Sequence, residues 1–329
     1  MVKMPQTRER RRIVGDYTIS VYDVINQRRY SDTISYHRSS FDTHGMIIDP
    51  FFILNPPEKR HMIYDADVPL RCLLPKGIEG VIVTGLGASA HRDAMPVIRM
   101  QPDLQNQGYA AGLAAADSIM QDTPFRDLDM RSVQKQLVEK GNLPQEVLTD
   151  VDAYEITKKE MEEVMALIPN GYEGLEKVLA FPEVSVPLLK KWYGTVPSSQ
   201  KHYYGNILTM LKQPVGWESV LEQVKNFDDW DKGWNYRGMH QFGYSLSRLD
   251  NYVMALGYTG RKEVVTELRR LADKLTPESE FSHVRAMAIA AENLKSEALA
   301  ASLSALLQTV SCYAYTIITV INLTCSLKP

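Results

Sequence analysis

The chain has 329 residues, 44% of them hydrophobic, and a formal net charge of -3. This length is enough for about two domains with cores of their own. The charge excludes a strongly basic surface at the level of the whole chain, so we expect no nucleic-acid partner. The three cysteines (Cys72, Cys312 and Cys325) lack paired spacing, which argues against a disulfide framework or a metal site and favours a reducing, cytoplasmic setting.

The first 120 residues predict short strands and loops. The basic cluster at 8–12 is followed by IVGDYTISVYDV rather than by an apolar core, so it does not resemble a signal peptide. Turns are predicted at 55–59 and 75–77, where Pro, Asn, Lys and Gly gather.

Residues 81–116 are the most informative segment. The apolar run 81–83 predicts a short buried parallel strand that ends at Gly85 and Gly87. The Gly- and Ala-rich stretch 108–116 predicts a helix thin enough to pack closely. A strand that ends at glycines ahead of a helix can present backbone amides to a cofactor.

Two other interpretations of the glycines are open. The run GLGASA at 85–90 fits the dinucleotide fingerprint G-x-G-x-x-A, or it is a plain structural turn. A Rossmann turn must lead directly into a helix, which Pro96 opposes, and no second strand ending in an acid follows at the required distance. Pro102, by contrast, suits the first turn of a helix, and Asp103 places a negative charge where the helix dipole favours it.

The rest of the chain predicts helices. Residues 121–190 read as connecting helices, with apolar residues at helical spacing at Ile156, Met161, Val164, Met165 and Ile168. From about 215 onward, amphipathic helices in pairs resemble a HEAT-type repeat, more often a scaffold than a catalyst. Their predicted apolar faces are formed by Val264, Val265, Leu268, Leu271, Ala272 and Leu275, by Val284, Met287, Ala288, Ala291 and Leu294, and by Leu299, Leu303 and Leu306.

The tail, residues 311–329, has no charge before Lys328 and is rich in β-branched residues. It is a poor membrane span because of its Ser, Thr and Asn content, so a membrane is not an expected partner. A membrane span, a buried helix with a strand, and a non-native end that stands in place of further helices are the alternatives. We favour the last and predict that deleting the tail leaves the helical content unchanged.

A collinear series of motifs carries a family resemblance. It consists of Gly85, RMQP at 99–102 and GYAAG at 108–112, with further stretches at 11–24, 42–44, 70–75 and 233–257. The series resembles the C-terminal FAD-binding segment of bacterial FAD-dependent oxidoreductases of the glutathione-reductase-like superfamily. In that family a strand ends at glycine, a loop follows, and R-x-x-P opens a helix that contains G-x-A-A-G. Leu86 stands where the family usually has Arg, and Arg92 where it commonly has His, with His91 one place earlier.

The resemblance implies an FAD cofactor and a small organic substrate. The amides of the first helical turn, near Asp103, Leu104 and Gln105, are expected to face the N1/O2 edge of the isoalloxazine. Small residues at Gly108, Ala111, Gly112 and Ala115 are expected to let the helix approach the sheet. The complete set of expected cofactor contacts is Gly85, Leu86, Arg99, Met100, Gln101, Pro102, Asp103, Leu104 and Gly108.

Catalytic and substrate-binding candidates follow from the chemistry of His and Arg. His44 and Arg99 are the catalytic candidates, and Arg71, His91 and Arg92 the substrate-binding ones. Histidine can carry a proton, and arginine can hold a carboxylate with two hydrogen bonds. A structural role is the alternative for each.

We therefore expect an α/β fold, a partial FAD-binding domain over 1–125, followed by an all-α part. That part comprises connecting helices at 126–214 and HEAT-like repeats at 215–310, with the tail at 311–329. The sequence has no N-terminal Rossmann fingerprint for the ADP half of FAD. We expect the chain to be the C-terminal part of a flavoenzyme, with the Rossmann half supplied by an upstream chain. The alternative is a catalytically inactive helical-repeat interaction protein that retains half a flavin fold.

Overall fold

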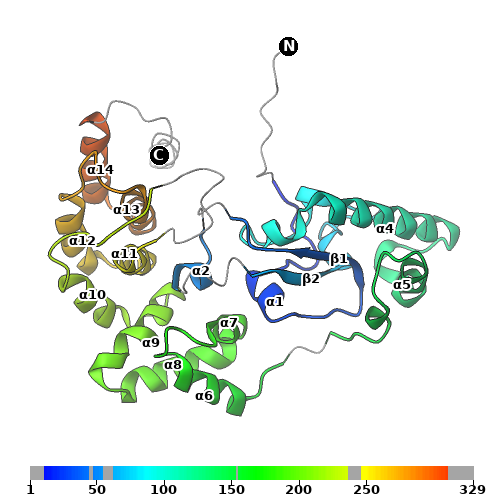
Figure 1. The fold of residues 1–329 in the computed structure, drawn as a ribbon, viewed down its shortest axis with the longest axis horizontal. Helices are drawn as coiled ribbons and strands as arrows, with labels where there is room; N and C mark the ends of the chain where they lie inside the picture. Colours follow the sequence, from blue (N-terminus) through cyan, green and yellow to red (C-terminus); the bar gives the residue numbers. More distant parts are fainter. Residues whose placement is uncertain (1–10, 44–46, 55–61, 153–154, 236–245, 310–329) are drawn as a thin grey trace. The chain divides into compact units, whose positions relative to one another are not determined.

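The computed structural model describes residues 11–43, 47–54, 62–152, 155–235 and 246–309, which divide into two compact units. Unit 1 comprises Met1–Thr43 and Glu58–Ile156, and unit 2 comprises His44–Pro57 and Thr157–Pro329. Helices make up most of the described chain (Figure 1), and the one sheet of these ranges has two strands. Packing between helices therefore builds the core of unit 2.

The two strands of unit 1 form an antiparallel pair. β1 (Thr33–Ser39) pairs with β2 (Tyr64–Pro69), with Tyr36 opposite Asp67 and Arg38 opposite Asp65. Successive side chains of a strand point to opposite faces, so Ser35 and His37 share the face opposite to Tyr36 and Arg38. Ser35 and His37 are buried.

Three α-helices of the described part of unit 1 accompany the strands. The longest, α4, lies along β1, and the next helix in the chain packs on α4, as Figure 1 shows. The first helix begins with a capping box, in which the Ser20 side chain accepts from the Asp23 amide and the Asp23 side chain accepts from the Ser20 amide. The bounds are α1 (Val21–Ile25), α4 (Gln101–Met120) and α5 (Met130–Glu139).

The predicted strand at 81–83 is wrong. These residues are irregular, Val81 is 42% exposed, and the Val83 amide donates to the Leu73 carbonyl at 2.8 Å. A parallel strand needs neighbours that bury both of its faces, and the described sheet contains only an antiparallel pair. The expected α/β class is thereby corrected: unit 1 carries helices on a small antiparallel sheet.

The structure agrees with the arguments against a Rossmann turn. Gly85–Gly87 forms one turn of 3-10 helix, and Pro96 lies in a second one, Met95–Ile98. No α-helix follows the glycines directly. The next one, α4, begins at Gln101, one residue before the predicted Pro102.

Unit 2 is helical throughout its described part. Its helices are α2 (Pro50–Leu54), α6 (Lys158–Leu167), α7 (Leu175–Ala180), α8 (Pro182–Thr195), α9 (Ser198–Met210), α10 (Trp217–Lys225), α11 (Arg248–Tyr258), α12 (Val265–Ala272), α13 (Phe281–Leu294) and α14 (Glu297–Thr309). Capping boxes start α6, with Thr157 and Glu160, and α11, with Ser247 and Asp250. Short capped helices of this kind gain most of their stability from packing.

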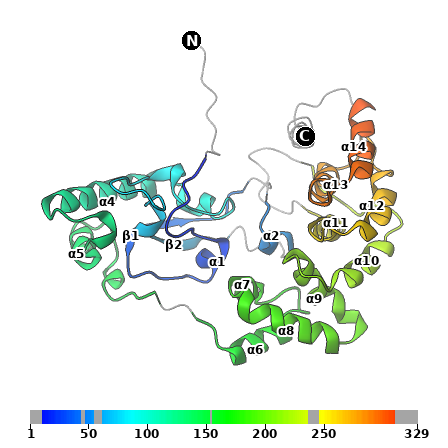
Figure 2. The same cartoon turned by 180° about the vertical axis from the view of Figure 1, so that it is seen from behind.

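The predicted apolar faces of the last helices are confirmed. All predicted members are buried except Val265 and Leu294, which are partly exposed. Figure 2 shows α11, α12, α13 and α14 together within unit 2, where α13 packs on α11 and on α14. The HEAT-like assignment of these helices stays a prediction.

Four expectations fall wholly or partly outside the described ranges: His44, the turn at 55–59, part of the motif stretch 233–257, and the tail 311–329. The described helices include none that is both long and apolar enough to cross a membrane.

Candidate functional site

The glycine turn and α4 are joined by one buried side chain. The Gly85 amide donates to Oε1 of Gln107, in α4, at 2.7 Å, and Gln107 is fully buried. Gly85 has φ +69°, a conformation that other residues adopt only with strain. The predicted cofactor segment is thus one connected element in which the turn is fixed against the second turn of the helix.

The start of α4 has no side-chain cap. Its N-cap residue is Met100, whereas α5 is capped by the Asp129 carboxylate. The Leu104 amide donates to the Met100 carbonyl at 3.0 Å, so the expectation that this amide faces a cofactor is corrected: the helix itself uses it. Pro102 has no N–H, which leaves the amides of Gln101 and Asp103 as the donors of the first turn.

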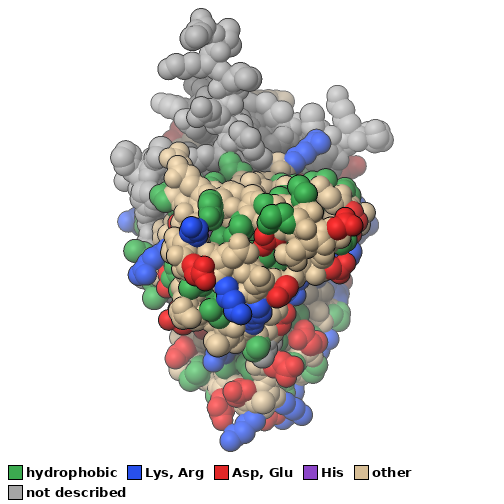
Figure 3. Space-filling model, turned by 90° about the vertical axis from the view of Figure 1, so that its right-hand side faces the viewer, with side chains coloured by type: hydrophobic (Ala, Val, Ile, Leu, Met, Phe, Trp, Pro, Cys, Tyr) green, Lys and Arg blue, Asp and Glu red, His purple; other side chains and the backbone are tan. Residues whose placement is uncertain are grey.

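The buried face of α4 differs from the expected one. Gly108 and Gly112 are exposed, and a Cβ at either position would meet nothing within 4 Å. The small residues that pack inward are Ala110, Ala111 and Ala114. The outward face also carries Tyr109, Ile119 and Met120, which are 48%, 81% and 75% exposed. In Figure 3, which looks onto the end of unit 1 where α4 and α5 lie, apolar side chains are visible among acidic and basic ones.

A buried polar network under α4 was missed by the sequence reasoning. Nε2 of His37 lies 2.9 Å from the Ser35 hydroxyl and 3.4 Å from Nε2 of Gln107. Its Nδ1 lies 3.7 Å from the Asp103 carboxylate. Burial lowers the pKa of His37 to about 4. The sequence signal that was available is the alternation of buried and exposed side chains along β1. The inward-facing residues Ser35 and His37 are polar, so hydrophobicity does not reveal this alternation.

Arg99, the residue before Met100, is anchored inside unit 1. Its side chain is 7% exposed, and Nη2 donates to the Asp42 carbonyl at 2.9 Å and lies 3.7 Å from the Asp42 carboxylate. Arg99 therefore anchors Asp42. In the sequence, Asp42 stands two residues before His44, the other catalytic candidate.

Arg71 is held by two carboxylates. Its guanidinium makes bonds of 2.8–3.1 Å to Asp32 and a bond of 2.8 Å to Asp152. Burial opposes the charge, but these carboxylates raise the pKa of Arg71 above its ordinary value. Arg71 lines a cavity of about 380 Å³ together with Arg126 and Asp16, which bond each other at 2.8 Å. A substrate carboxylate would have to displace one of these acids.

His91 and Arg92 lie on the loop that pairs with the N-terminal segment. The His91 amide donates to the Ile19 carbonyl at 2.7 Å, and Arg92 forms a 2.8 Å ion pair with Asp93, which is fully buried. Burial lowers the pKa of His91. The substrate candidates are thus already paired with acids: Arg71 with Asp32 and Asp152, and Arg92 with Asp93.

The N-terminal segment approaches this loop closely. The Ile13 amide donates to the Gly87 carbonyl at 2.9 Å, and a Cβ on Gly15 would lie 2.8 Å from Cβ of Ser89. Glycine at position 15 is therefore required by space. Two motifs of the family resemblance, at 11–24 and around 85, are neighbours in the fold.

One family model matches part of the chain. No curated protein and no solved structure matched the chain. Residues 2–137, which include the described elements of the predicted cofactor segment, match the model of the family described as FAD dependent oxidoreductase. The proteins of that family bind FAD, in agreement with the predicted cofactor.

Proposed function

We propose that the chain is part of an FAD-dependent oxidoreductase of the glutathione-reductase-like type, in which unit 1 holds the isoalloxazine and a small organic substrate. The observation that carries the proposal is the uncapped start of α4 beside the Gly85–Gly87 turn, within the range that matches the family. The match gives no support to the inactive helical-repeat alternative.

The donors of α4 fit the cofactor. The amides of Gln101 and Asp103 have no side-chain cap, Gln101 is exposed, and the helix dipole adds partial positive charge at this end. The N1/O2 edge of a flavin is electron-rich and becomes more so on reduction. The Asp103 carboxylate accepts the Arg38 amide at 3.2 Å, so β1 holds this negative group.

Bound FAD would supply hydride and electron transfer, and the protein would supply orientation and electrostatics. In this proposal the first turn of α4 stabilises negative charge on the flavin edge. Gln107 holds the Gly85 turn against the helix. Arg99 and His44 are the candidate catalytic residues, and unit 2, with HEAT-like helices, serves as scaffold.

The ADP half of FAD would be held by a Rossmann element from an upstream chain. The accessible face of α4 supports this part of the proposal. Gly108 and Gly112 leave open space there, and Tyr109, Ile119 and Met120 offer apolar surface for a second element to cover.

The test removes one amide without disturbing the helix. Gln101→Pro deletes the N–H at the first helical position, where proline is well tolerated, and Met100 already has the extended conformation that precedes proline (φ -69°, ψ 140°). Gln101→Ala, the matched control, keeps the N–H. Each variant is purified alone and after co-expression with the product of the upstream reading frame, and FAD binding is measured by flavin fluorescence.

We expect little FAD in the isolated chain and a yellow complex after co-expression. Gln101→Pro should then bind FAD about tenfold more weakly than Gln101→Ala, since a hydrogen bond to a charged group contributes about 1.5–3 kcal/mol. Equal FAD affinity of the two variants would show that the first-turn amide of α4 does not contact the cofactor. Tight FAD in the isolated chain would overturn the two-chain arrangement, and no FAD in either preparation would overturn the proposal.

A further inference from the structure

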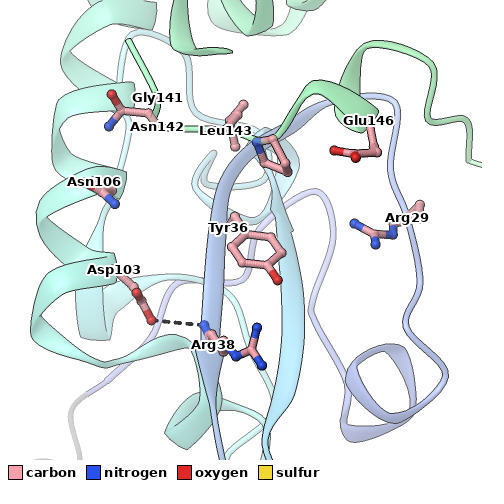
Figure 4. Close-up of a pocket in the computed structure, with 10 residues that line it drawn as sticks. Arg29, Tyr36, Arg38, Asp103, Asn106, Gly141, Asn142, Leu143 and Glu146 are labelled. Atoms are coloured by element: carbon pink, nitrogen blue, oxygen red, sulfur yellow. Dashed lines mark hydrogen bonds between the residues drawn. The ribbon is translucent and has the colours of Figure 1, made fainter. Parts of the chain in front are cut away.

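Unit 1 has a cavity of about 590 Å³ on the side of β1 that carries Tyr36 and Arg38. Figure 4 shows its walls: Tyr36 and Arg38 come from β1, Asp103 and Asn106 from α4, and Glu146 from the segment after α5. The volume lies within the range of small-molecule sites, about 300–1,000 Å³. Asp103, one of the expected cofactor contacts, lines this cavity, and none of the predicted catalytic or substrate-binding residues does.

Both cations of the cavity already have counter-charges. Nη1 of Arg29 lies 3.2 Å from each carboxylate oxygen of Asp67, a buried residue. Nη1 of Arg38 lies 3.6 Å from Asp65, and the Arg38 side chain is 65% exposed. An anionic ligand would compete with these acids, so the guanidinium groups serve better as hydrogen-bond donors than as partners for a charge.

The remaining charged groups of the wall are acceptors. Asp103 and Glu146 line the cavity, and with Asp65 and Asp67, the partners of the two arginines, the carboxylates outnumber the guanidinium groups. Burial raises the pKa of Asp103 above its ordinary value. Asn106 also lines the cavity, and its amide both donates and accepts.

The donors and acceptors are held in fixed places. α5 ends at Glu139 with Lys140 as its C-cap, Gly141 has φ +75°, and the Asn142 amide donates to the Leu137 carbonyl at 2.8 Å. This helix-terminating turn sets Asn142 at the wall of the cavity. Burial and the neighbouring Asp65 raise the pKa of Tyr36 to about 12, so its phenol keeps its proton at neutral pH.

We propose that this cavity binds a neutral, polyhydroxylated molecule the size of a monosaccharide. Hydroxyl groups donate to carboxylates and accept from guanidinium, amide and phenol groups, all of which the wall presents. The ring of Tyr36 supplies an apolar surface for the C–H face of such a ligand. A neutral ligand also avoids the cost of bringing an uncompensated charge into the cavity.

The test needs no FAD, so it stands apart from the flavin proposal. D-glucose and myo-inositol are the neutral probes, benzoate and glutamate the charged ones, and binding to the full chain is measured by saturation-transfer NMR. The cavity variants are Tyr36→Ala and Asn106→Ala. Asn106 is exposed on α4, where alanine favours the helix, so the second variant keeps the fold. Tyr109→Ala, on the outward face of α4, is the matched control.

We expect saturation of at least one neutral probe by the unaltered chain and by Tyr109→Ala. Asn106→Ala should weaken binding about fivefold, the effect of one neutral hydrogen bond, and Tyr36→Ala about tenfold. Absence of transfer to both neutral probes, or binding that the two cavity variants leave unchanged, would overturn the proposal. A stronger response from benzoate or glutamate would do the same and assign the cavity to a charged ligand.

Discussion

Three arginines of the predicted site each pair with an aspartate of the same unit: Arg71 with Asp32, Arg92 with Asp93 and Arg99 with Asp42. A buried carboxylate such as Asp93 is stable only with a counter-charge or hydrogen bonds. These arginines therefore stabilise unit 1. The same ion pairs fix the orientation of their side chains for any catalytic role.

Arg99→Ala distinguishes the two roles. Its loss leaves Asp42 without the hydrogen bond and the ion pair, so we expect unit 1 to lose about 1.5–3 kcal/mol of unfolding free energy. Urea denaturation with hydrogen exchange of unit 1 measures the loss. Arg11→Gln, at an exposed arginine, should change stability by less than about 0.5 kcal/mol. Unchanged stability with lost turnover would instead mark Arg99 as catalytic.

Among the helices, α11 and α13 approach each other closely at Gly257. A Cβ on Gly257 would lie 2.5 Å from Cα of Ala290 and 2.9 Å from its Cβ. Backbone cannot move aside as a flexible side chain can, so the two helices pack at this distance only because residue 257 is glycine.

Gly257→Ala should therefore destabilise unit 2 by about 1–3 kcal/mol through overpacking. Gly194→Ala is the matched control, because Gly194 lies in α8 with nothing within 4 Å of its Cβ position. Alanine there should stabilise the helix by about 0.5–1 kcal/mol. Thermal melts followed by circular dichroism measure both changes. Equal effects at the two positions would contradict the close packing of α11 and α13.

For the whole molecule, the two units contain buried histidines in opposite protonation states. His37 in unit 1 is neutral, because burial lowers its pKa to about 4. In unit 2, His283 has Nδ1 2.7 Å from the Asp250 carboxylate and Nε2 2.9 Å from the Asp231 carbonyl, so both nitrogens donate and the ring is charged. Burial opposes this charge, but Asp250 and then Glu280 raise the pKa of His283.

The two units should respond to pH in opposite directions. Between pH 6.5 and about 4 an unfolded His37 takes up a proton that the folded one does not, so unit 1 loses up to about 3 kcal/mol as the pH falls. The stability from His283 is complete below the unfolded pKa of about 6.5 and is lost as the pH rises through its higher folded pKa.

All four tryptophans (Trp192, Trp217, Trp230 and Trp234) belong to unit 2, so their fluorescence reports its unfolding, and hydrogen exchange of β1 and α4 reports unit 1. His37→Gln and His283→Gln should each flatten the pH dependence of its own unit only. Parallel pH profiles in the two units would show that these histidines do not control stability.

The sequence by itself determined the local features. Apolar residues three and four apart fix which side of α12, α13 and α14 is buried, because a helix places them on one face. Pro102 predicted the start of α4 within one residue, because proline lacks only an N–H that the first turn does not use. The series of motifs predicted FAD, and the family match agrees.

Only the tertiary structure decided which side of α4 packs inward. Small residues of α4 lie on all sides of the helix, so the sequence shows little difference in hydrophobicity between its two faces. The buried positions also include the polar residues Gln107 and Asp117. Gln107 contacts Gly85, 22 residues away in the sequence, and His37, 70 residues away. Buried polar groups that are satisfied by such distant partners leave no hydrophobic pattern in the sequence. The run 81–83 has strand-forming residues, but the fold gives it no neighbouring strand with which to pair.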